Sequence, residues 1–229
     1  MLPARNPVLA GLGKAADSGQ AGVLQVSGES EGAIYLSAGL IAYAESRRTP
    51  DLATRLEKAA AAARAGTVSS LERNWLAREA TVDAATGLLV GKPRHAKFRA
   101  SGDLDPRVMA SLPVAVLISE VSRRLELIRQ MSAVLTADTT VTRCPRISSG
   151  AVHVSDLQWA IVMQAGHAVT PRSLALELGQ SVFGTTIEVF RMVSMGLLAV
   201  AGAPARPAAG AGEPGRGRPG ISFIRALAG

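Results

Sequence analysis

The stretch that most restricts the fold of this chain is residues 22–46, GVLQVSGESEGAIYLSAGLIAYAES. Apolar residues alternate there with polar or small ones in three short runs: Leu24 and Val26, Ile34 and Leu36, Ile41 and Tyr43. A period of two is typical of strands that place one face on a core. Glycines between the runs allow tight reversals of the chain. The segment therefore predicts three consecutive antiparallel strands.

Helices and a fourth strand are expected after this segment. Thr49 is expected to cap a helix over 51–65, because proline follows it and proline suits the first helical position. Ser69 is expected to cap a second helix, with Glu72 completing a capping box. The segment KPRHAKFRA then alternates basic and apolar residues, which predicts a return to the sheet over His95–Arg99.

A linker over 101–111 leads to a long helix that Pro113 opens. Its apolar stripe includes four residues at helical spacing: Leu117, Val121, Leu125 and Ile128. A narrow stripe of this kind is typical of a bundle or coiled-coil seam. Two interpretations follow, packing within the helix's own domain and docking of a second copy of the chain.

After a second linker over 136–151, the C-terminal part has a different pattern of predicted elements, with shorter helices. Ser155 is expected to cap a short helix, and Thr170 followed by proline is expected to start another. A third helix follows Phe183, and the segment GLLAV reads as a strand. Three short helices followed by a strand are typical of a winged helix-turn-helix.

The whole pattern predicts an α+β fold with a small N-terminal antiparallel sheet, a long linking helix and a winged-helix-like domain. The expected boundaries are 1–112 for the first domain, 113–151 for the connecting helix and linker, and 152–203 for the second domain. Residues 204–220 are rich in Pro, Gly and Ala, so we expect them to be disordered. Residues 221–229 are expected to form a short strand that docks back as part of the wing.

Composition indicates how the cores are built and in which compartment the protein works. The formal net charge is +7, and aromatic residues make up only 3% of the chain, so Ala, Leu and Val must build the cores. One cysteine, Cys144, excludes an internal disulfide and indicates a reducing compartment. The N-terminus lacks a signal-peptide core, and the longest apolar helix carries five charges. We therefore expect a cytoplasmic protein without a membrane span.

The residues that could perform chemistry are scattered. His95, His153 and His167 stand alone, and no phosphate-binding, nucleophile-elbow or metal-ligand motif occurs. Cys144 lies next to a proline in a linker, which favours an incidental thiol over a nucleophile. The sequence therefore predicts a protein that is not an enzyme and that holds no cofactor and no metal.

Local charge bears on nucleic-acid binding, which depends on Lys and Arg contacts to phosphates. Residues 151–203 carry two basic and three acidic groups, a net charge of −1, and their only cations are Arg172 and Arg191. On the third helix, Thr185, Thr186 and Glu188 are expected to be exposed. These threonines and the two arginines are the candidate DNA contacts, although the charge argues against tight binding by this unit alone.

A second basic group lies on the fourth predicted strand. The period of two would place His95, Lys97 and Arg99 on one face of the sheet. This stripe is either a solvated outer face or a contact for nucleic acid or an acidic partner. We count Lys97 and Arg99 among the candidate nucleic-acid contacts.

The run GAIYLSAGLIAYAES and its flanks resemble the start of the PATAN domain, a bacterial signalling module with the pattern "g.iyf..G.i.ha", helices and a closing "g.f.f" strand. Residues 152–200 are similar to winged-helix modules that accompany PATAN-like domains in actinobacteria, and together with 8–100 they cover most of the chain. Ala38-Gly39 departs from the Asp/Asn-Gly turn common in the family. The resemblance implies protein–protein contacts in bacterial regulatory systems, including small GTPase and response-regulator circuits, with a GTPase or a roadblock-type protein as the partner.

Two functional hypotheses follow. The first is a non-catalytic signalling adaptor that acts through a protein partner. The second is a transcription regulator that uses the winged helix as a dimer, since dimerisation would double its few phosphate contacts.

Overall fold

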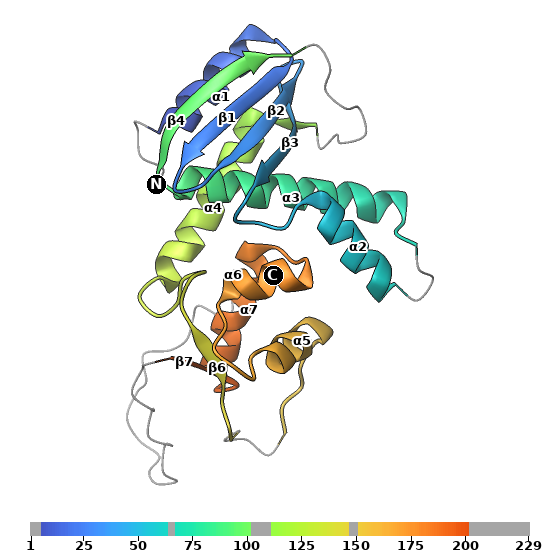
Figure 1. Ribbon diagram of the computed structural model, residues 1–229, viewed down its shortest axis with the longest axis vertical. Helices are drawn as coiled ribbons and strands as arrows, with labels where there is room; N and C mark the ends of the chain where they lie inside the picture. The colour runs from blue at the N-terminus through green and yellow to red at the C-terminus, as the bar shows by residue number, and fades with distance from the viewer. Residues whose placement is uncertain (1–5, 64–66, 102–110, 147–150, 202–229) are drawn as a thin grey trace.

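The computed structural model describes residues 6–63, 67–101, 111–146 and 151–201, and it has a mixed α+β fold (Figure 1). The helices are α1 (Pro7–Ser18), α2 (Leu52–Ala62), α3 (Ser70–Val90), α4 (Val114–Met131), α5 (Asp156–Gln164), α6 (Pro171–Leu178) and α7 (Val182–Ser194). The strands are β1 (Gly22–Gly28), β2 (Gly32–Ser37), β3 (Leu40–Ser46), β4 (Pro93–Ala100), β5 (Leu112–Pro113), β6 (Val141–Arg143) and β7 (Leu198–Val200).

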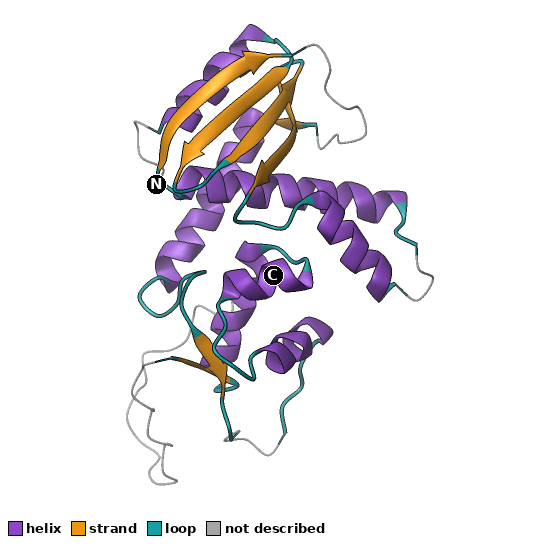
Figure 2. Ribbon diagram, in the orientation of Figure 1, coloured by secondary structure: helices purple, strands orange, loops and turns teal. Residues whose placement is uncertain are grey.

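The N-terminal sheet has the strand order β4-β1-β2-β3-β5 with antiparallel pairing throughout (Figure 2). This confirms the three strands predicted from the period of two and the fourth strand around His95–Arg99. The β2–β3 turn places Ala38 at φ +50° and Gly39 at φ +74°, the left-handed pair that a two-residue hairpin needs. Ala38 adopts this conformation although it lacks the side-chain hydrogen bonding that lets Asn or Asp tolerate it.

Helices α1, α3 and α4 cover the inner face of this sheet and share one core with it. Its largest fully buried side chains are Leu12, Leu24, Ile34, Leu36, Ile41, Leu88, Leu112 and Leu117. Helix α1 was not predicted, although Asn6 caps it and Pro7 occupies its first position. The Asn6 side chain also donates a hydrogen bond to the Leu89 carbonyl oxygen, which ties α1 to the end of α3.

Helix starts were predicted with mixed success. Ser69, Ser155 and Thr170 cap α3, α5 and α6 as expected. At α2, however, the cap is Asp51, whose side chain accepts from the Thr54 amide, so the prediction of Thr49 was wrong. Thr49 instead turns its hydroxyl back to the Ser46 carbonyl oxygen, one turn earlier.

The C-terminal part has a second core, formed by α5, α6 and α7 with the β6–β7 ribbon. Its buried members include Leu135, Val141, Ile161, Leu174, Val189 and Met192. Strand β6 lies in the stretch that was predicted as a linker. Val141 pairs both with Val200 of β7 and with Val169 between α5 and α6, so β6 runs between these two segments.

Two expectations fall outside the described residues, namely disorder over 204–220 and a returning strand over 221–229. Helix α4 ends at Met131, earlier than the predicted end near residue 135. Within the part of the chain that the structure describes, no helix has both the length and the apolar character to cross a membrane.

Candidate functional site at the domain junction

The inner half of α3 is buried on every side. Each residue from 80 to 86 is buried, because the sheet core lies against one side of the helix and α6–α7 approach the other (Figure 1). Thr81 and Thr86 turn their hydroxyl groups back to the carbonyl oxygens of Ala77 and Val82. These bonds satisfy both hydroxyl groups locally, which leaves Asp83 as the polar group that faces another element.

Asp83 binds the beginning of α7. Its Oδ1 accepts hydrogen bonds from the Ser181 hydroxyl at 2.9 Å and from the Phe183 amide at 3.2 Å, and its Oδ2 accepts from the Val182 amide at 2.9 Å. The first amides of a helix have no partner within the helix and carry a partial positive charge. A carboxylate from the first core therefore caps a helix of the second.

Arg55 supplies the compensating charge. Its Nη2 lies 2.6 Å from Asp83 Oδ2, its Nε donates to the Pro50 carbonyl oxygen, and both charged side chains are only 2% exposed. Removing one member of such a pair leaves the other charged and buried, which is strongly destabilising. The junction thus joins α2, α3 and α7 through a single carboxylate.

Arg124 of α4 forms a second cluster beside Asp83. Its Nη2 binds both oxygens of Glu79 at 2.7 and 2.8 Å, and its Nε binds Glu120 at 2.9 Å. Its guanidinium carbon lies 4.8 Å from the centre of the Phe183 ring, a cation–π contact. The Nη1 atom lies 3.9 Å from Asp83 Oδ1, so the two clusters are adjacent.

Close backbone approach and a surface ion pair extend the junction. Gly179 in the α6–α7 turn has φ +66°, and a Cβ there would lie 3.3 Å from the Thr54 carbonyl oxygen of α2. On the surface, Arg172 binds Asp138 at 2.7 Å and donates to the Arg48 carbonyl oxygen. The hydrogen bond from Arg172, and then the charges of Arg172 and Arg48, hold the pKa of the Asp138 carboxyl below its usual range.

Of the candidate DNA contacts on α6 and α7, the two threonines are buried and the two arginines are paired with carboxylates. Thr185 and Thr186 are 1% and 3% exposed, so the prediction that they are exposed was wrong. The Thr186 hydroxyl donates to the Val182 carbonyl oxygen of its own helix. Arg191 pairs with Glu188 one turn away, and Arg172 is engaged in the ion pair with Asp138.

Lys97 and Arg99 are exposed together with His95 on the outer face of the sheet, as the period of two predicted. A groove of about 890 Å³ lies over this face, and Lys97, His95, Glu31 and Glu45 contribute to its lining. Tyr35 lies there too, and burial together with its hydrogen bond to Glu45 raises the pKa of the phenol to about 12. The face carries both signs of charge, so it is not a purely basic surface.

The apolar stripe of α4 faces its own core. Leu117 and Val121 are fully buried and Leu125 packs against the same cluster, while Ile128 is partly buried. The prediction that a second copy docks through Leu117 and Val121 is therefore wrong. The alternative interpretation, packing within the helix's own domain, describes these residues.

Cys144 is half-buried in the structure. Burial raises the pKa of the Cys144 thiol, which disfavours the thiolate that a nucleophile requires. Among residues 6–63, 67–101, 111–146 and 151–201, no three His, Cys, Asp or Glu side chains are grouped so that they could hold a metal ion.

Comparison of the chain with protein-family models, curated proteins and solved structures found no match. The resemblance to PATAN and winged-helix domains therefore stays a prediction.

Sequence reasoning missed the junction residues Asp83, Arg55 and Glu79. One signal was present, because Asp83 interrupts the small and apolar run TVDAATGLL, where a charge needs a partner. Arg124 pairs with Glu120 along its own helix and with Glu79 of α3, and the second pair joins residues 45 positions apart in the sequence.

Proposed function

We propose that this protein is a non-catalytic bacterial regulatory protein that works in the cytoplasm through contacts with other proteins. The observation that carries the proposal is the capping of α7 by Asp83. In a winged helix-turn-helix, the last helix enters the major groove with its first residues. Here the first residues of α7 are bound to α3, and the side chains that would read bases are buried.

Charge supports the same conclusion. Residues 151–201 carry Arg172 and Arg191 against Asp156, Glu177 and Glu188, and both arginines already have carboxylate partners. Several free cations are needed for useful affinity to a phosphate backbone. A unit with a net charge of −1 suits a protein partner better than duplex DNA. The resemblance of residues 8–100 to PATAN domains also favours a regulatory role, with a GTPase or roadblock-type partner.

A second candidate function is a duplex-binding transcription regulator. It is supported by the order α5, α6, α7 and β7, with a turn of only three residues between α6 and α7. For this function the junction must open first, and Asp83 would then act as the contact that holds α7 away from DNA.

Duplex binding by the full chain separates the two candidates. The proposal predicts no binding at low salt, either by the natural chain or by the Asp83→Ala variant. The second candidate predicts that Asp83→Ala binds, that affinity falls steeply with added salt, and that Arg191→Glu weakens it further. Ser181→Ala gives a milder opening of the junction if Asp83→Ala folds poorly. Salt-dependent binding by any of these chains would contradict the proposal.

A further inference from the structure

The outer face of the N-terminal sheet is the face opposite to α1, α3 and α4, which pack on the inner face. Figure 2 shows the outer face turned toward the viewer, with α1 and α4 behind the strands. An antiparallel sheet commonly has one face on the core and one face in solvent. The order of the side chains across the outer face carries further information, and the strand register fixes that order.

Two rows of side chains cross the outer face in the strand order β4-β1-β2-β3. The register pairs define the first row, which runs Lys97, Gln25, Ala33, Glu45. The same pairings define the second row, two residues along each strand, which runs Arg99, Val23, Tyr35, Tyr43. Residues two apart on a strand share a face, so both rows belong to one surface.

Opposite charges stand at the two ends of the first row. Lys97 lies at the β4 end and Glu45 at the β3 end, and both are exposed. Because neighbouring strands are about 4.8 Å apart, the two residues are separated by roughly 14 Å, well beyond ion-pair distance. Glu45 instead accepts a hydrogen bond from the Tyr35 hydroxyl at 2.8 Å. The row is therefore polarised from a basic end to an acidic end.

This polarity matches a second copy of the same face. A two-fold axis that runs parallel to the strands between β1 and β2 keeps each row at its own level and reverses its direction. It places Lys97 of each copy opposite Glu45 of the other, which forms two equivalent ion pairs. An axis across the strands would instead set β4 over β4, with Lys97 and Arg99 facing cations of the other copy, and like charges disfavour that arrangement.

The shape of the face suits the same axis. A groove of about 890 Å³ lies over it, and Val23, Gln25 and Ala33 contribute to the lining between Lys97 and Tyr35. The axis sets Tyr35 of each copy opposite Val23 of the other, so that a tyrosine side chain can fill part of each groove. Tyrosine is enriched at protein interfaces. Sheets that pack face to face are about 10 Å apart, which leaves room for one layer of interdigitating side chains.

We propose that a second copy of this chain packs on the outer face of the sheet, with the strands of the two copies aligned, to form a symmetric dimer. The basic residues of β4 then meet β3 of the other copy, where Glu45 lies. This surface differs from the α4 stripe through Leu117 and Val121, which is buried. The inference does not depend on the proposed function, because it involves neither DNA nor the contact between Asp83 and α7.

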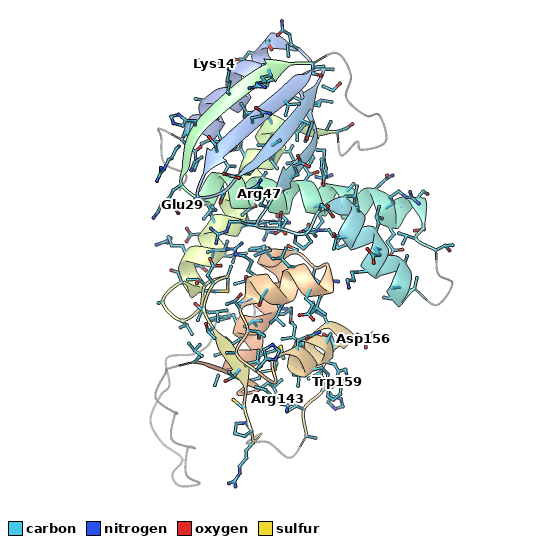
Figure 3. The ribbon with its side chains drawn as sticks, in the orientation of Figure 1. Lys14, Glu29, Arg47, Arg143, Asp156 and Trp159 are labelled. Carbon is cyan, nitrogen blue, oxygen red and sulfur yellow. The ribbon has the colours of Figure 1, made fainter. Side chains whose placement is uncertain are left out.

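Sedimentation of the full chain over a wide range of concentrations tests this dimer, and we expect a monomer–dimer equilibrium. Lys97→Glu and Glu45→Lys should each raise the dissociation constant roughly 10-fold or more, because each places two like-charged pairs across the interface. The two variants shift the net charge in opposite directions, so weakening in both cannot come from net charge. Lys14→Glu is the matched control and should leave the equilibrium unchanged, since Lys14 is exposed on α1, on the other side of the sheet (Figure 3).

Mixing the two variants tests whether the occupant is a second copy. In a heterodimer of the Lys97→Glu chain with the Glu45→Lys chain, both facing pairs again have opposite charges. The equimolar mixture should therefore associate as the natural chain does, although neither variant does so alone, and circular dichroism checks that both variants are folded. A natural chain that stays monomeric at every concentration would overturn the proposal. So would a mixture that associates no better than its components, or a Lys14→Glu chain that is weakened as much as Lys97→Glu.

Discussion

In the two halves of α3, the polarity of the side chains is the opposite of what their burial would suggest. The outer half, residues 70–75, is exposed yet carries Leu71 and Trp75, whereas the inner half, residues 80–86, is buried yet carries Asp83. The inner half can bury a carboxylate because α2 and α7 supply donors for it. The difference indicates that the inner half of α3 has its partners within the chain, while the outer half leaves Leu71 and Trp75 on the surface.

The largest expected effect comes from the buried carboxylate. Asp83→Ala removes four hydrogen bonds and leaves Arg55 buried and uncompensated. We expect the free energy of unfolding to fall by about 3–5 kcal/mol. Chemical denaturation followed by circular dichroism measures this change.

Two variants at exposed positions serve as controls for Asp83→Ala. Leu71→Ala in the outer half and Asp17→Ala on α1 alter exposed side chains, so each should change the free energy of unfolding by less than about 0.5 kcal/mol. If Asp83→Ala were as mild as these two changes, the buried network would contribute little to stability.

A smaller effect is expected from the contact between Arg124 and Phe183. Because both groups are at least partly desolvated at the junction, a double-mutant cycle with Arg124→Ala and Phe183→Leu should give a coupling energy of about 1–2 kcal/mol. Urea unfolding of the four proteins supplies the cycle. Strict additivity would show that the ring and the guanidinium do not interact.

The Ser181 cap of α7 is expected to contribute to the free energy of unfolding about as much as the contact between Arg124 and Phe183, or less. Ser181→Ala removes the hydroxyl that donates to Asp83 and accepts from the Gly184 amide, so the free energy of unfolding should fall by about 1 kcal/mol. Ser155→Ala at α5 is a matched control, since its capping hydroxyl bonds the Gln158 amide and is exposed. An equal loss in both variants would mean that the bond to Asp83 adds nothing.

Acid titration is expected to give the smallest effect. Hydrogen bonds from Arg123 and then Arg124 lower the pKa of Glu120 to about 2 from 4.5. A lowered folded-state pKa stabilises the protein above the unfolded value, and this stabilisation is lost as pH falls from about 4.5 through about 2. Glu120→Gln should flatten the dependence of stability on pH in this window. An unchanged slope would contradict the assignment.

Local patterns were enough to predict much of the fold. The strands over 22–46 were found because alternation is a local signal, and Ser69, Ser155 and Thr170 were found because a cap bonds within its own helix. Strand β6 was missed because it has only three residues and depends on pairing with Val169 and β7, which are distant in sequence.

The junction could not be predicted in the same way. Periodicity locates one apolar face, but the inner half of α3 is covered on all sides, so residues 80–86 show no face. The exposure of Thr185 and Thr186 was predicted by treating α7 as a free helix. It was wrong because both side chains are buried, and α7 is bound at its first turn by Asp83, about a hundred residues earlier.

The most direct test of the account is hydrogen exchange at the Val182 and Phe183 amides. First-turn amides have no partner in their own helix, so the hydrogen bonds that protect Val182 and Phe183 are those that Asp83 accepts. We predict slow exchange at both amides, fast exchange at the exposed first-turn amide of Leu71, and loss of protection in Asp83→Asn. Fast exchange of Val182 and Phe183 in the natural chain would contradict the central claim that α3 holds α7 by its first turn.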